Sequence, residues 1–148
     1  MKTFKCITLS LLIALVLFSC KSDDDSGSSS EPTLEERIAY KWYYKQIYSP
    51  ETDETTIADA CEQNSFYNFL SNGNALIEIF TTASDASCES SGLYQPTYIV
   101  GEFEGETGLF LTFEDGSTEG YIIVSINNST LVLEQRGFGI RQMTFTKE

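Results

Sequence analysis

Hydrophobic and polar residues alternate along most of the chain after residue 40, which is the pattern of β-strands with one buried face. Val, Ile, Thr, Tyr and Phe are frequent in these stretches, as in strands of a half-buried sheet. This pattern predicts eight strands, at residues 41–49, 65–71, 75–82, 97–103, 108–114, 119–126, 130–136 and 140–147.

Short turn signals separate the predicted strands. Asn72-Gly73 predicts a type I′ hairpin turn, which needs a positive φ at both residues. Because such short connections leave no room for crossover helices, neighbouring strands are expected to be antiparallel. The fold class is therefore all-β, an eight-stranded antiparallel up-and-down barrel, with a two-sheet sandwich as the alternative. Four more turns are expected at residues 104–108, 115–117, 127–129 and 137–139.

One short helix is predicted before the first strand, within residues 31–39. The run Thr33-Leu34-Glu35-Glu36 has the form of a capping box, in which Thr33 caps the helix and Glu36 reaches back to it. Leu34 and Ile38 lie one turn apart and are expected to close an apolar opening. We assign residues 31–148 to a single barrel domain.

The first 30 residues follow a different pattern. Residues 1–19 combine a basic start with an apolar run that is too short to cross a bilayer but fits a secretory signal. The sequence Leu17-Phe18-Ser19-Cys20 resembles the bacterial lipobox, which implies a lipid on Cys20 and an anchor in the outer membrane. A plain secreted protein is the alternative reading of Cys20.

Residues 20–30 are rich in Ser and Asp and are expected to form a flexible acidic tether after the lipidated cysteine. Within it, residues 23–25 are three aspartates. They resemble the export signal of surface-exposed lipoproteins of the Bacteroidota, or they simply keep the tether solvated. The expected location is the cell envelope, on the periplasmic or the outer side of the outer membrane.

Composition excludes several classes of function. The chain has 148 residues, 9 Lys+Arg, 22 Asp+Glu, a net charge of −13 and no histidine. Without histidine, Ser-His-Asp and Cys-His catalysis and the usual zinc sites are excluded, and an acidic surface repels nucleic acid. We expect no enzyme, cofactor or metal site. The remaining catalytic alternative is a carboxylate pair among Glu102, Glu104 and Glu106, which their turn and edge positions explain more simply.

Two cysteines belong to the predicted barrel. Cys61 precedes the second strand and Cys88 follows the third, on either side of the Asn72-Gly73 turn. Cysteines in an oxidising compartment are expected to pair, and the hairpin register brings these two within disulfide reach. The alternative is two free thiols.

Together these features resemble the lipocalin-like domains of small Bacteroidota lipoproteins. The similar pieces are Lys41-Trp42, Cys61 before Phe69-x-x-Asn72-Gly73, Cys88 before Tyr98, Ile123-x-x-Ile126 before Leu131-Val132-Leu133, and Met143-Thr144-Phe145. Tyr40 departs from the pattern, since the family has Gly there. The resemblance implies an eight-stranded barrel with a cup-shaped interior, no catalytic residues and no established ligand for most members.

Strand alternation assigns side chains to the barrel interior. Such an interior would suit a small apolar or amphipathic ligand, while a barrel filled by its own side chains is the alternative. The candidate ligand-binding residues are Trp42, Tyr44, Tyr67, Phe69, Tyr98, Phe113, Leu133 and Met143, with Arg141 on the same face near one end. The same alternation places Val124 inside.

A second function is open to the outer surface. Tyr43 and Tyr48 are expected to point outward, and exposed tyrosines are common at protein interfaces. The protein would then be an accessory subunit of an outer-membrane or cell-surface assembly. The barrel domain itself is expected to be monomeric.

Overall fold

The computed structural model describes residues 31–137 and 139–147. The predicted signal peptide, Cys20 and the tether lie outside these residues. Two short helical segments are present, α1 at Leu34–Ile38 and the 3-10 helix η1 at Glu62–Asn64. The strands are β1 Lys41–Ser49, β2 Glu54–Ile57, β3 Phe66–Phe69, β4 Ala75–Thr82, β5 Cys88–Tyr94, β6 Thr97–Phe103, β7 Glu106–Thr112, β8 Thr118–Ile126, β9 Thr130–Arg136 and β10 Ile140–Thr146.

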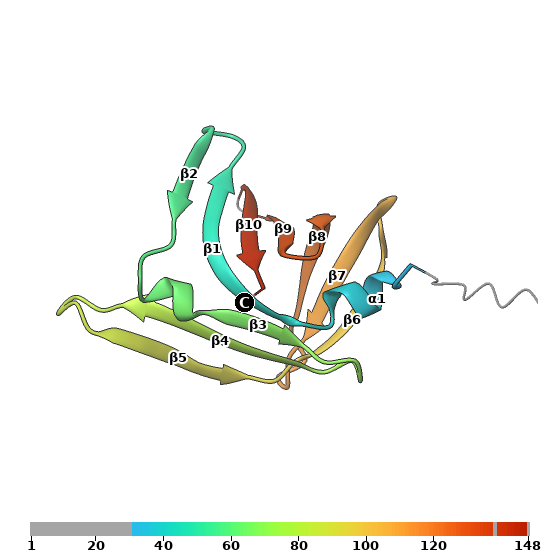
Figure 1. The fold of residues 1–148 in the computed structure, drawn as a ribbon, viewed down its shortest axis with the longest axis horizontal. Coiled ribbons are helices and arrows are strands. Elements are labelled where there is room, and N and C mark those ends of the chain that lie inside the picture. Colours follow the sequence, from blue (N-terminus) through green and yellow to red (C-terminus); the bar gives the residue numbers. More distant parts are fainter. Residues whose placement is uncertain (1–30, 138, 148) are drawn as a thin grey trace, which may run out of the picture. The chain divides into compact units, whose positions relative to one another are not determined.

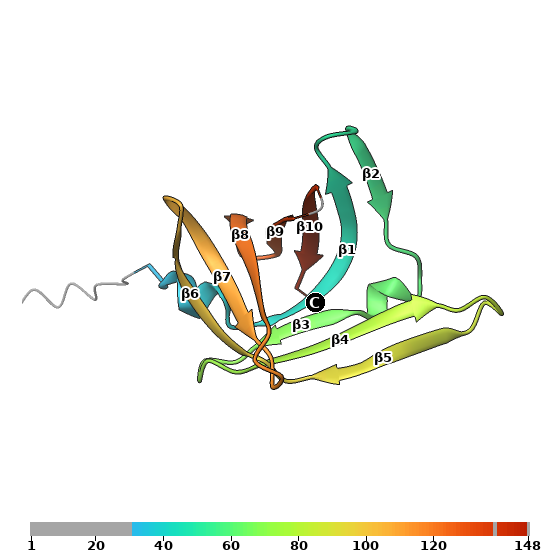
Figure 2. The same cartoon turned by 180° about the vertical axis from the view of Figure 1, so that it is seen from behind.

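All these strands belong to one antiparallel sheet in the order β5-β4-β3-β1-β10-β9-β8-β7-β6, with β2 paired to the second half of β1. β5 and β6 are two parts of one bent segment, because β5 pairs with β4 whereas β6 pairs with β7. At the bend, Ala75 N donates to Pro96 O and Tyr98 N donates to Gly73 O. The two ends of the strand order are thereby joined, and the sheet curls into a partly open barrel (Figures 1 and 2).

The predicted all-β antiparallel fold is confirmed, and a sandwich of two separate sheets is wrong. The eight expected strands are present with ends shifted by a few residues, and two more strands, β2 and β5, were not expected. Every residue of β2 and of β5 is exposed. Neither strand has a buried face, so the alternation that reveals a strand in a sequence is absent.

The hairpin at Asn72-Gly73 is confirmed, but its turn is not type I′. Gly73 has a φ of 83°, whereas Asn72 has no positive φ. Leu70 N donates to Asn74 O and Gly73 N donates to Leu70 O, so the connection is longer than a two-residue turn. Only the glycine has to adopt the left-handed conformation in this wider loop.

Helix α1 closes one part of the barrel, as predicted. Its capping box is present, with Thr33 N donating to Glu36 Oε2 at 2.8 Å and Glu36 N donating to Thr33 Oγ1 at 3.2 Å. Ile38 and Trp42 are both fully buried, and the Trp42 indole donates to Ile38 O at 2.9 Å. The Arg37 guanidinium donates to Ile126 O at the end of β8. The helix therefore seals the interior where β1 begins and β8 ends.

The assignment of Val124 to the interior is wrong. The pairing of β8 with β9 shifts between Ile123 and Ser125, and this bulge changes which side chains point inward. Val124 is 46% exposed, whereas Tyr121 and Ile123 belong to the core or pack against it. A one-residue shift reverses the facing of the residues around it, and the sequence carries no mark of the bulge.

The disulfide between Cys61 and Cys88 is confirmed, with a Cα–Cα distance of 5.4 Å. It joins the residue before η1 to the first residue of β5. No helix among the described residues combines the length and apolar character that crossing a bilayer requires.

Candidate ligand-binding site

A cleft of about 560 Å³ opens between strands β3–β5 and the turn that joins β7 to β8. Its apolar walls are formed by Tyr67, Ile77, Ile79, Leu93, Tyr94 and Phe113, and its polar rim by Gln95, Glu114, Asp115, Ser117 and Glu119. We call these residues the aromatic cleft. Its volume lies in the range of small-molecule binding sites, and so does its make-up of apolar walls with a few polar groups.

Strand pairing brings the walls of the aromatic cleft together. Tyr67 of β3 pairs with Ile77 of β4, and Ile77 pairs in turn with Tyr94 of β5. Tyr94 and Phe113 pack edge to face with ring centroids 6.3 Å apart, so they join β5 to the end of β7. These two aromatic side chains are partly open to solvent, and Tyr67 lies at the buried end.

A chain of polar groups runs from the core to the rim. The Tyr121 hydroxyl donates to Glu119 Oε2 at 2.5 Å, which holds this rim carboxylate in place. Burial is the main cause that raises the pKa of Tyr67 to about 12, and the charge of Glu119 adds to it. Burial also raises the pKa of Tyr121. Both tyrosines are therefore neutral at physiological pH, and the Tyr121 hydroxyl is a hydrogen-bond donor.

The β7–β8 turn presents a second carboxylate. Hydrogen bonds from the Ser117 hydroxyl and the Ser117 backbone N–H lower the pKa of Asp115, and the N–H lies 2.9 Å from Asp115 Oδ1. Gly116 has a φ of 82°, which lets the chain reverse at this point. Asp115 therefore remains ionised at the rim at neutral pH.

A smaller hollow of about 180 Å³ adjoins the aromatic cleft. It shares Tyr67 and Ile79 with the cleft, and Tyr44, Met143 and Phe145 are among its other residues. The Tyr67 and Phe145 rings lie 5.0 Å apart in an edge-to-face contact. Tyr67 and Ile79 thus line both spaces.

The structure divides the candidate residues into four groups. Tyr67 and Phe113 line the aromatic cleft, and Tyr44 and Met143 line the smaller hollow. Arg141 is exposed on β10 and lines neither space. The others belong to the packed core: Trp42, Phe69, Tyr98 and Leu133. The interior is thus filled near α1 and hollow towards the β7–β8 turn.

Several residues of the aromatic cleft could not be identified from the sequence. Leu93 and Tyr94 lie on β5, which has no alternating pattern, and they are 51% and 43% exposed. Glu114 and Glu119 lie at the ends of two strands that the sequence predicts, and Asp115 lies in the turn between them, so no pattern marks them as ligand contacts. The turn was recognisable in the sequence, but its position over the cleft depends on the bent segment that joins β5 to β6.

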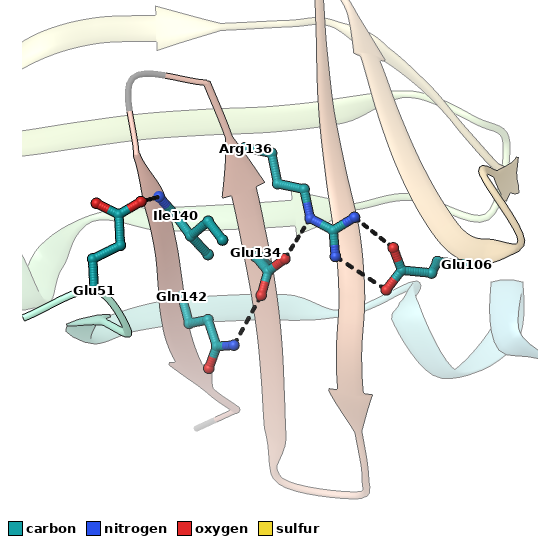
Figure 3. A network of polar contacts seen from close by, with 6 residues as sticks. All are labelled: Glu51, Glu106, Glu134, Arg136, Ile140 and Gln142. Atoms are coloured by element: carbon teal, nitrogen blue, oxygen red, sulfur yellow. Dashed lines mark hydrogen bonds and ion pairs between the residues drawn. The ribbon is translucent and has the colours of Figure 1, made fainter. Parts of the chain in front are cut away.

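None of Glu102, Glu104 and Glu106, the carboxylates considered for catalysis, lines the aromatic cleft. Glu106 instead makes an ion pair with Arg136, whose Nη1 lies 2.5 Å from Glu106 Oε2 (Figure 3). Arg136 Nε also lies 2.6 Å from Glu134 Oε1, and Gln142 donates to the other oxygen of Glu134 at 2.9 Å. This network ties β7, β9 and β10 together, which is a structural role.

Alkaline pH tests the burial of Tyr67. Because its pKa is about 12 in the folded protein and 10.0 for a tyrosine in water, the unfolded chain loses this proton first. The stabilisation is complete below pH 10 and is lost as the pH rises through 12. We expect the urea concentration at the unfolding midpoint to be lower at about pH 11.5 than at about pH 9. The difference should be smaller for the variant Tyr67→Phe. Equal falls in both proteins would contradict the assignment.

Comparisons with known proteins bear on the fold. No family model and no curated protein matches the sequence. A solved lipocalin-like protein from Bacteroides uniformis is 17% identical, with a TM-score of 0.49, and the match covers 76% of this chain and 99% of that one. An uncharacterized protein from Bacteroides eggerthii is 13% identical, with a TM-score of 0.51, over 75% and 99% of the two chains. The match to the Bacteroides eggerthii protein shows that the two chains share a fold.

Proposed function

We propose that this protein is a non-catalytic binding protein that holds a small apolar or amphipathic molecule in the aromatic cleft. The observation that carries the proposal is an open space of about 560 Å³ with six apolar wall residues, next to the packed core around Trp42. In this proposal Asp115 and its neighbours at the rim contact the polar part of the ligand, and the apolar walls contact the rest.

We place the protein at the cell envelope, anchored in the outer membrane through a lipid on Cys20. The support is the sequence pattern alone: a short apolar run, the lipobox-like Leu17-Phe18-Ser19-Cys20, and the acidic tether of residues 20–30. A disulfide between Cys61 and Cys88 is consistent with an oxidising compartment.

A second candidate function is an accessory subunit of an envelope assembly. The outer surface of β6 and β8 supports it, because Ile99, Phe103 and Val124 are 66%, 44% and 46% exposed. Tyr43 and Tyr48, expected to mark such a surface, are half-buried, and the Tyr48 hydroxyl donates to Asp53 Oδ1 at 3.0 Å. A barrel that bound no small apolar probe would favour this second function.

Binding of the neutral fluorescent probe Nile red tests the proposed function. We expect the double variant Tyr94→Ala/Phe113→Ala to bind the probe at least fivefold more weakly, since an aromatic anchor contributes more than ~1 kcal/mol. The matched control is Ile99→Ala/Phe103→Ala on the outer surface, which we expect to bind normally. Equal weakening in both double variants would show that the probe reports on surface hydrophobicity rather than on the cleft.

A further inference from the structure

We propose that the aromatic cleft selects amphipathic molecules that carry a cationic head group. This inference rests on the proposed function, since it names the chemical class of ligand for the same site. It follows from the charges on the rim, the aromatic walls and the position of one carboxylate.

The rim charges of the aromatic cleft all have one sign. Glu114, Asp115 and Glu119 line it, whereas no Lys or Arg is among its residues. Hydrogen bonds from Ser117 hold Asp115 in its ionised form. The whole chain carries a net charge of −13, so its long-range field also attracts cations. An anionic head group at this rim would meet like charge with no basic side chain to pair with it.

The walls below the rim suit a cation as well. Tyr94 and Phe113 pack edge to face in the wall of the cleft, and Tyr67 is the most buried of its three aromatic residues. Aromatic ring faces attract cations, and sites for quaternary ammonium groups are built from several such rings. The aliphatic residues Ile77, Ile79 and Leu93 complete the wall and offer contacts to a hydrocarbon chain.

Glu119 is held where its charge acts on the interior of the cleft. Tyr121 donates to one of its oxygens at 2.5 Å, and this donor is itself buried. The charge of Glu119 reaches Tyr67, where it disfavours the tyrosinate. Because Glu119 and Tyr67 both line the aromatic cleft, the charge of Glu119 acts on a ligand held there. A fixed carboxylate loses less conformational freedom on binding a cation than a free one.

The one basic residue expected to contact a ligand, Arg141, would suit an anionic head group. Arg141 is exposed on β10 and is not among the residues of the aromatic cleft. The cleft thus offers a fatty-acid carboxylate or a phosphate ester no partner of opposite charge.

Three octyl amphiphiles that differ only in the head group test the selectivity. Their head groups are trimethylammonium, glucoside and sulfate, and the measurement is the displacement of Nile red from the full chain by each compound below its micelle concentration. We expect the trimethylammonium compound to bind roughly tenfold more tightly than the sulfate, with the glucoside between them. Added salt should weaken the binding of the cationic compound and leave that of the glucoside unchanged.

The double variant Asp115→Asn/Glu119→Gln assigns the selectivity to the rim. It keeps side-chain shape and an acceptor for Tyr121, and we expect it to lose roughly fivefold in trimethylammonium affinity with unchanged glucoside affinity. The control Glu102→Gln/Glu104→Gln removes the same charge from residues outside the cleft and should retain the preference.

The outcomes separate the two proposals. If all three amphiphiles displace the probe equally and the rim variant has no effect, cation selectivity is wrong, but the cleft is still a binding site. If the control variant loses the preference as strongly as the rim variant, selectivity comes from net charge and the inference is wrong. If Nile red does not bind and no amphiphile displaces it, the proposed function and the cation selectivity are both wrong.

Discussion

Replacing Trp42 by alanine is expected to lower the free energy of unfolding by about 3–5 kcal/mol, the usual cost of removing a buried Trp side chain. Trp42 is fully buried, and its indole donates to Ile38 O at 2.9 Å. Its loss therefore empties space in the core and removes one of the two donors to the Ile38 carbonyl, which also accepts from Tyr40 N. Helix α1 would lose its hydrogen bond to Trp42 at the same time.

Urea unfolding followed by far-UV circular dichroism measures this effect, because Trp42 is the only tryptophan and its fluorescence disappears with it. The matched control is Tyr40→Ala, which removes the neighbouring ring from a residue that is 51% exposed. We expect the control to cost less than about 1.5 kcal/mol. Similar losses in the two variants would contradict the role of Trp42 as the centre of the packing around α1.

Removing the Cys61–Cys88 disulfide is expected to cost about 3–4 kcal/mol from chain entropy, because the bridge closes a loop with a sequence separation of 27. The bridge also fastens β5, whose residues are all exposed and which otherwise depends on its pairing with β4. Since β5 supplies Leu93 and Tyr94 to the aromatic cleft, we expect the variant Cys61→Ser/Cys88→Ser to bind Nile red more weakly as well.

Thermal and urea unfolding of the double serine variant, compared with the oxidised protein, measure the loss of stability. A reducing agent added to the unmodified chain should reproduce it, and the same agent should leave the double variant unchanged. A variant as stable as the oxidised protein would contradict the prediction. Normal stability with lost probe binding would show instead that the bridge acts on β5 locally.

The sequence predicted those features that depend on local periodicity and local hydrogen bonding. The alternation of residues 41–49 and 75–82, the capping box at Thr33 and the turn at Gly73 are each written in a few neighbouring residues. The structure has β1, α1 and the hairpin in these places. The disulfide between Cys61 and Cys88 could be predicted for the same reason, because the register of one hairpin sets the distance between them.

Two kinds of feature could not be predicted from the sequence: a strand that has no buried face, and a change of register within a pair of strands. β5 has no buried face, so the sequence around Leu93 and Tyr94 does not alternate between apolar and polar residues. The bulge after Ile123 turns Val124 outward. Several of the candidate ligand residues, such as Trp42, pack in the core. Alternation along a strand shows which side chains face the interior of a barrel, but it does not show whether that interior is filled or hollow.

The sequence by itself determined the antiparallel all-β fold, the helical closure and the acidic character, since these follow from periodicity, caps and composition. Only the tertiary structure decided where the interior is open. The bent segment of β5 and β6 pairs with β4 on one side and β7 on the other. That long-range pairing sets Asp115 and Glu119 over Tyr67, and no local pattern encodes the approach of segments so far apart in the chain.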